Sequence, residues 1–218
     1  MGLICQCPAA AAIDYVPNVS CPVNFGQIQK IAFQRLTKAD GTKNKFTTAS
    51  SILLKASWTT FLTAADGSKV VVTPYVNAPA DSGGDARMTS GGNDDLGGIP
   101  EVLGGNPVEF TAQLRACPQT VAKALKSLIC EANVGNLGVY LFDENGQIEA
   151  IAGETAGDYF PIPIRAFFVG DKVHGNYDAK DSNAISWQYA EGYSDDLAIV
   201  VPTDFNPLTD LQNAVPTP

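Results

Sequence analysis

The sequence predicts a mainly β (α+β) fold: a β-sandwich or barrel with one or two flanking helices, a long glycine-rich loop and extended terminal arms. Three observations predict this. Residue types that favour strands (Val, Ile, Phe, Tyr and Thr) recur throughout the 218 residues. The 20 Gly and 14 Pro indicate many turns. Several segments also alternate apolar and polar residues with the period of a half-buried strand. A chain of this length can bury one large core.

The domain boundaries follow from where regular patterns begin and end. We expect an N-terminal arm over residues 1–25, where prolines interrupt every pattern. A β-rich domain is expected over 26–201, with an inserted loop at 78–106. A C-terminal arm is expected over 202–218, stiffened by four prolines. The apolar residues of this last arm suggest that it docks onto its own body or onto a neighbour: Phe205, Leu208 and Leu211.

The strands are predicted in order along the chain. The clearest is 108–115, in which Val108, Phe110, Ala112 and Leu114 share one face. A hairpin is predicted over 137–152, because Asn145 and Gly146 can supply the positive φ of a tight turn. The other predicted strands are 27–36, 69–76 (with an edge or bulge at its proline), 159–169, 184–190 and 197–201.

Two segments favour helices. Residues 118–132 begin with a proline and carry one apolar stripe, and Asn133 to Asn136 ends the helix. Residues 49–64 are ambiguous, because Trp58 and Leu62 fit helical spacing whereas the β-branched content favours a strand. A helix is the preferred interpretation here.

The 78–106 segment is the most unusual part of the sequence. Four glycine doublets alternate with acidic residues and few large apolar ones, so the segment has little to bury and much backbone entropy to lose. Loops of this length are usually functional or disordered. We expect it to order against a neighbouring copy. The expected interface residues are Gly83, Gly84, Gly91, Gly92, Asp94, Asp95, Gly97, Gly98 and Ile99 in the loop, with Phe205, Leu208 and Leu211 in the C-terminal arm.

The charge excludes some functions. The formal net charge is −9 with only 14 Lys and Arg, which argues against a nucleic-acid reader. A surface past which DNA must slide without sticking could still be acidic. No apolar run approaches the roughly 20 residues of a membrane span, so no membrane partner is expected. The N-terminus is a poor signal peptide, so synthesis in the cytoplasm is expected.

No catalytic residue, metal site or cofactor is predicted. The single histidine, His174, could be combined with Ser182 and Asp178, but no G-x-S-x-G motif exists and an ordinary surface histidine is favoured. The adjacent acidic pairs at 94–95 and 195–196 point to opposite faces if extended. Carboxylate partners from distant positions stay open, because a single sequence does not show them.

The aromatic residues leave a minority alternative. Trp58, Trp187, Tyr189 and Tyr193 could form a sugar-binding platform, with Trp187 and Tyr189 on one strand face. Core positions are the more common role of such residues. The five cysteines match no common zinc or redox spacing, and buried free thiols are favoured over a bond from Cys5 or Cys7 to Cys21.

Five runs, which together cover 78 of the 218 residues, resemble virion proteins of phages and prophages from gut Bacteroidetes. They are ASWTTFLTAADGSKVVVTPYV, GGNDDLGGIPEVLGG, PQTVAKALKSLICE, VYLFDENGQI and SDDLAIVVPTDFNPLTDL. The order of elements resembles tail-tube proteins. This resemblance implies a non-enzymatic subunit, located in the virion, that forms stacked rings around a DNA channel. It would contact copies of itself and other virion proteins, and DNA would pass without sequence-specific binding.

The departures from the tail-tube pattern leave alternatives. A second helix at 49–64 and an N-terminus rich in Cys and Pro also suit a capsid auxiliary or decoration protein, or a head-tail connector. A more distant alternative is a secreted carbohydrate-binding β-sandwich, which would need Trp187 or Tyr189 exposed. A hydrolase would need two acidic side chains that converge in a cleft.

Overall fold

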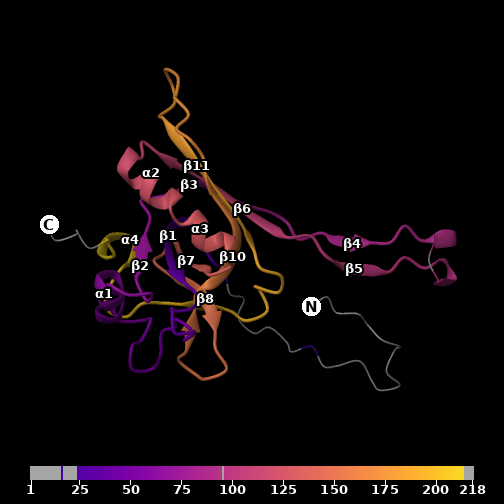
Figure 1. Ribbon diagram of the computed structural model, residues 1–218, viewed down its shortest axis with the longest axis horizontal. Coiled ribbons are helices and arrows are strands. Elements are labelled where there is room, and N and C mark those ends of the chain that lie inside the picture. The colour runs from indigo at the N-terminus through magenta and orange to yellow at the C-terminus, as the bar shows by residue number, and fades with distance from the viewer. Residues whose placement is uncertain (1–15, 17–23, 95, 214–218) are drawn as a thin grey trace. The chain divides into compact units, whose positions relative to one another are not determined.

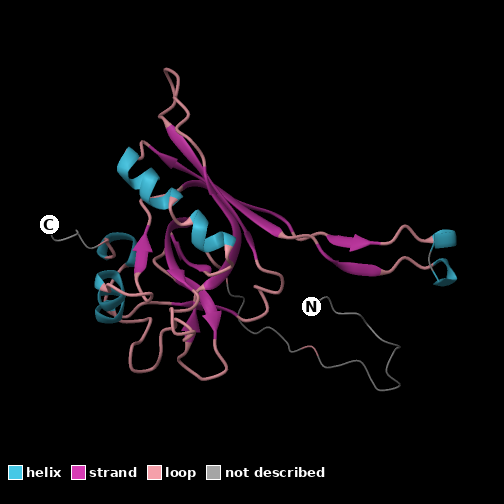
Figure 2. Ribbon diagram, in the orientation of Figure 1, coloured by secondary structure: helices cyan, strands magenta, loops and turns pink. Residues whose placement is uncertain are grey.

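The computed structural model describes residues 16, 24–94 and 96–213 (Figure 1). The described chain divides into two compact units. The main unit comprises residues 25–82 and 108–213, and the hairpin unit comprises Gly83–Pro107. The fold is mainly β with few helices, as predicted, and consists of a large antiparallel sheet flanked by short helices (Figure 2).

Strands β1 (Ile28–Arg35) and β7 (Leu137–Asp143) form the centre of the main unit. They pair antiparallel along nearly their whole length. On its other side β7 pairs with two strands in succession: β10 (Ile162–Val169) at residues 137–139 and β8 (Ile148–Ala152) at residues 141–142. The sheet therefore branches at β7.

One branch continues from β10 through β11 (Ser182–Tyr189) and β6 (Val108–Arg115) to β3 (Asn77–Gly83). The other continues from β8 to β12 (Leu197–Val200), with the short β9 (Tyr159–Phe160) also paired to β8. On the free side of β1 lies β2 (Val70–Val72). The β6 strand has the predicted bounds and burial alternation. The predicted strand at 69–76 is shorter than expected, because pairing as a strand ends before Pro74.

Alternation along β1 and β7 supplies two hydrophobic cores. Ile31, Phe33 and Leu141 belong to the first core, together with residues of β6, β10 and β11. Ala32 and Tyr140 belong to the second core, together with Trp58 and Leu211. Because successive side chains of a strand point to opposite faces, two paired strands can serve both cores.

The helices differ from the predicted ranges at their ends. Helix α1 (Lys55–Thr63) confirms a helix within 49–64 and buries Trp58 and Leu62. It has no local side-chain cap; instead the backbone N–H of Lys55 donates to Asp204 Oδ1 at 2.9 Å. The predicted helix over 118–132 is two helices, α2 (Gln119–Lys126) and α3 (Ile129–Asn133), with Pro118 one position before the first.

The 143–146 turn of the β7–β8 hairpin is confirmed, with one correction. Only Gly146 has a positive φ, 77°, whereas Asn145 does not. The fully buried Asp143 holds the turn instead: its Oδ1 accepts the backbone N–H groups of Asn145 (3.0 Å) and Gln147 (2.7 Å). Its Oδ2 accepts the N–H of Gly26 at 3.0 Å, which fixes the start of the main unit.

The C-terminal segment packs on the main unit. Helix α4 (Pro207–Asp210) begins after Asn206, whose side chain accepts the N–H of Leu208. Leu211 is fully buried in the second core, and Phe205 and Leu208 pack against that core. Lys30 Nζ donates to the carbonyl oxygens of Leu208 (3.1 Å) and Leu211 (2.7 Å). The sequence suggested that the C-terminal arm docks onto its own chain or onto a neighbour, and in this structure it docks onto its own chain.

Candidate functional site

The glycine-rich segment is a paired β-ribbon in the hairpin unit, where a loop was expected. Strand β4 (Ala86–Met88) pairs antiparallel with β5 (Val102–Gly105), and the two run side by side in Figure 1. Backbone hydrogen bonds continue on both sides of this pairing: Asn106 donates to Asp85 at 2.8 Å, and Thr89 donates to Glu101 at 2.9 Å. The glycines therefore serve a hairpin, and the unit is ordered by its own backbone.

Positive φ explains why the doublets are glycine. Within the turn end of the ribbon, two short 3₁₀ segments occupy Gly92–Asp94 and Leu96–Gly98. Seven of the eight doublet glycines have φ values that other residues rarely adopt: Gly83, Gly84, Gly91, Gly92, Gly97, Gly98 and Gly104. Asp95 lies outside the described residues.

The ribbon exposes apolar side chains. Met88 and Val102 are cross-strand partners and are 58% and 59% exposed. Leu103 is 62% and Ile99 69% exposed. A two-stranded ribbon has no core of its own and is marginally stable in water. These side chains are therefore available for contact with another surface.

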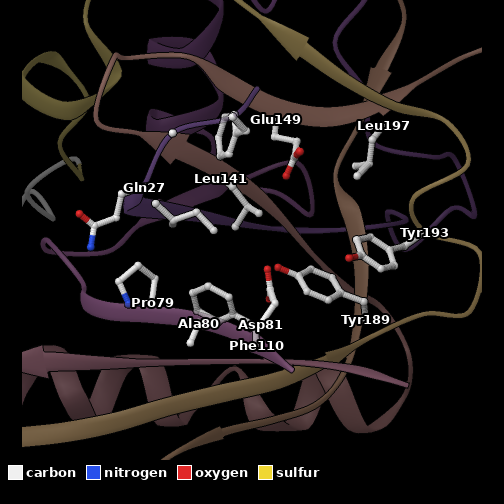
Figure 3. A pocket seen from close by; sticks show the side chains of 13 residues that line it. Gln27, Pro79, Ala80, Asp81, Phe110, Leu141, Glu149, Tyr189, Tyr193 and Leu197 are labelled. Atoms are coloured by element: carbon white, nitrogen blue, oxygen red, sulfur yellow. The ribbon is translucent and has the colours of Figure 1, made fainter. Parts of the chain in front are cut away.

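A second candidate site is a pocket in the main unit with a volume of about 310 Å³. It lies between β3, β8, β11 and the segment before β1. Figure 3 shows the carboxylates of Asp81 and Glu149 and the hydroxyls of Tyr189 and Tyr193 directed into the same space. The apolar wall includes Phe25, Ile28, Phe110, Leu141 and Leu197.

The sheet positions each polar group of the pocket. Glu149 lies on β8 opposite Leu141 of β7 and Ile199 of β12. Its neighbours Ile148 and Ala150 belong to the second core, so alternation turns Glu149 toward the first. Asp81 is exposed on β3, and Ala78 in the same strand has a strained φ of 49°.

The electrostatics of the pocket are one-sided. Burial raises the pKa of Glu149 to about 7, and the negative charge of Asp81 adds to this rise. Burial also raises the pKa of Tyr193, with smaller contributions from the two carboxylates. No Lys, Arg or His is among the residues that line the pocket. The arrangement therefore favours protonation or a positively charged occupant.

This convergence of two carboxylates was not predicted. The sequence pattern places Asp81 only in the glycine-rich segment and Glu149 only in a hairpin strand. One sequence feature could have indicated the pocket: Glu149 is a carboxylate in a strand, 148–152, whose other residues are all apolar. The partner comes from a distant strand, which is the possibility that the sequence left open.

The aromatic residues considered for a sugar-binding platform are buried, and the single histidine and the described cysteines form no site predicted from the sequence. Trp187 is 1% exposed and stacks on Phe110, with ring centroids 4.1 Å apart; Tyr189 is 4% exposed and Trp58 is fully buried. Burial of both Trp187 and Tyr189 contradicts the sugar-binding platform, which needed one of them on the surface. His174 is exposed, and its Nδ1 lies 3.4 Å from Asp181 Oδ2. Cys117 is buried and free as favoured, but Cys130 is exposed; the other cysteines lie outside the described residues.

Among the described residues no group of three or more His, Cys, Asp or Glu side chains could hold a metal ion. None of the described helices has the length and apolar character needed to cross a bilayer.

No protein-family model matches the sequence, and no curated protein does either. Solved structures with similar chains come from phage-like particles. The tail of an empty gene transfer agent particle superposes with a TM-score of 0.33 at 13% identity, covering 58% of this chain and 82% of that chain. A chain of the virion of a native gene transfer agent particle has a TM-score of 0.32 and 13% sequence identity, and the match covers 58% of this chain and 85% of that chain. A chain of the anti-feeding prophage baseplate has a TM-score of 0.35 and 7% sequence identity, and the match covers 84% of this chain and 98% of that chain.

Proposed function

We propose that this chain is a structural protein of a phage virion, a tail-tube subunit that assembles with copies of itself into stacked rings around a DNA channel. The single observation that carries an assembly role is the apolar surface of the hairpin unit. The five sequence runs that resemble phage virion proteins support the virion as its setting, and the net charge of −9 suits a channel past which DNA moves.

The hairpin unit would contact a neighbouring copy through its exposed apolar side chains. Burial of a side chain such as Leu103 or Ile99 contributes about 1.5–3 kcal/mol. Covering both would offset part of the entropy lost when copies associate. In the main unit, β12 pairs only with β8 among the described strands, and β3 only with β6. Strands of a neighbour could continue the sheet at these edges.

The C-terminal arm has a smaller part in this proposal than the ribbon. Leu211 is fully buried in the second core, so its role is internal. Phe205 and Leu208 are half-buried, and a neighbour could cover what remains of their surface.

Electron microscopy and sedimentation velocity of the purified full chain test the proposal. We expect rings or tubes as the concentration rises. The double variant Ile99→Ser, Leu103→Ser should associate at least about a hundredfold more weakly. Val173→Ser removes an apolar side chain of the main unit that is 65% exposed and serves as the matched control. A chain that stays monomeric at every concentration, with or without other virion proteins, would overturn the proposal.

A further inference from the structure

We propose that the pocket between Asp81, Glu149, Tyr189 and Tyr193 is a binding site for an organic cation, an alkylammonium or guanidinium group. This inference is independent of the assembly role, because the pocket lies wholly in the main unit and the apolar ribbon lies in the hairpin unit.

The charge of the pocket selects a cation. Two carboxylates from strands far apart in the sequence point into one space, and no basic side chain lines it. Lys45 pairs with Asp158 and Lys172 lies near Asp181, but neither Glu149 nor Asp81 has an ion-pair partner among the described residues. A carboxylate that is half-buried without a partner is costly, and an N–H cation would offset that cost.

The aromatic rings favour an organic cation over a bare metal ion. Tyr189 and Tyr193 stack with centroids 4.2 Å apart and an interplanar angle of 10°. Phe25 and Phe110 add further ring surface to the wall. Ring faces attract ammonium and guanidinium groups, and the apolar wall can cover the attached methylene groups.

A buried polar group supports a ligand independently of the carboxylates. Tyr189 is 4% exposed, and its hydroxyl points into the pocket. The indole N–H of Trp187, which lies near Tyr189, has no partner that meets hydrogen-bond geometry. The Tyr189 oxygen can accept a hydrogen bond from an N–H cation, and its proton can then turn toward a carboxylate.

Calorimetric titration of the full chain with n-butylammonium and with methylguanidinium tests the site, and 1-butanol is the uncharged control. We expect saturable binding of a cation and none of the alcohol. Glu149→Gln and Asp81→Asn should each weaken binding about tenfold. Asp81 is exposed, so the chain with Asp81→Asn should fold. This variant therefore tests the site even if Glu149→Gln prevents folding. Glu154→Gln removes an exposed carboxylate outside the pocket and should leave binding unchanged.

The pH dependence of binding gives a second readout. The titratable groups that face Glu149 are Asp81 on β3, Tyr189 on β11 and Tyr193. Glu149 is mainly protonated at pH 6 and ionised at pH 8, so binding should be about tenfold tighter at pH 8. Glu149→Gln should remove most of this difference. Absence of saturable binding of either cation at pH 8, or equal binding in the two pocket variants and wild type, would overturn the proposal.

The cation could be a free amine or a Lys or Arg side chain of a second copy. Probe binding together with weaker self-association of Glu149→Gln assigns it to a second copy. Probe binding with unaltered self-association assigns it to a free amine, and both results support the pocket. The Ile99→Ser, Leu103→Ser variant should bind the probe like wild type, so failure of the assembly proposal is distinguishable from failure of this one.

Discussion

The side-chain amide of Asn213 makes both hydrogen bonds that a neighbouring strand would make with Val72. The N–H of Val72 donates to Asn213 Oδ1, and Asn213 Nδ2 donates to the Val72 carbonyl, each at 2.7 Å. Val72 lies on β2, which among the described strands pairs only with β1. The C-terminal segment thus covers an edge that would otherwise be open to unwanted pairing.

Asn213→Ala should lower the free energy of unfolding by about 1–3 kcal/mol, since two hydrogen bonds are lost and the β2 edge is uncovered. Urea denaturation measures this change. Gln212→Ala, at the adjacent exposed position, is the control and should change stability by less than about 0.5 kcal/mol. Equal stability of the two variants would show that the edge contact contributes nothing.

Leu211→Ala should cost about 2–5 kcal/mol, because the side chain is fully buried in the second core and its loss leaves a cavity. Thermal or urea unfolding of the full chain gives the value. Val201→Ala, at a position 61% exposed, is the matched control. A loss below about 1 kcal/mol at Leu211 would mean that the C-terminal segment is not docked on the main unit.

Asp143→Ala should destabilise the chain by about 3 kcal/mol or more. Its carboxylate accepts three backbone N–H groups at a fully buried position, and the substitution leaves those donors unpaired. Asp178→Ala in an exposed loop is the comparison. Denaturation curves that coincide for the two variants would contradict this account of the turn.

Glu149→Gln should become more stable relative to wild type as the pH rises from 5 to 8. The pKa of Glu149 is about 7 in the folded chain and 4.5 as its ordinary value, so the folded state binds the proton more tightly. The stability that the protonated form supplies is full below pH 4.5 and is lost as the pH rises through 7. The expected change in the difference between variant and wild type is about 1–3 kcal/mol.

Urea denaturation at pH 5 and pH 8 measures that difference, and Glu154→Gln is treated in the same way as control. Comparing each variant with wild type cancels carboxylates whose pKa is lowered, such as Asp66. If the free energy of unfolding changes with pH by the same amount in Glu149→Gln and in wild type, the pKa of Glu149 is not raised in the folded chain.

Local patterns predicted much of the fold. The alternation from Val108 to Leu114 gave β6 because one face of that strand is buried and the other is exposed. The stripe over 118–132 predicted helical structure, but not the break after Lys126, because the stripe continues across it. The β4–β5 ribbon was missed because glycines that permit a hairpin have the same composition as a loop. The pocket was missed because only the branch of the sheet at β7 brings Glu149 near Asp81.

The way β1 and β7 serve both cores has a consequence for how the main unit comes apart. Phe33 and Ala32 are adjacent in the sequence yet belong to different cores, as do Leu141 and Phe142. Because both cores depend on β1 and β7, neither core can unfold while the other keeps these strands in place. Thermal denaturation of the main unit should therefore be a single cooperative transition.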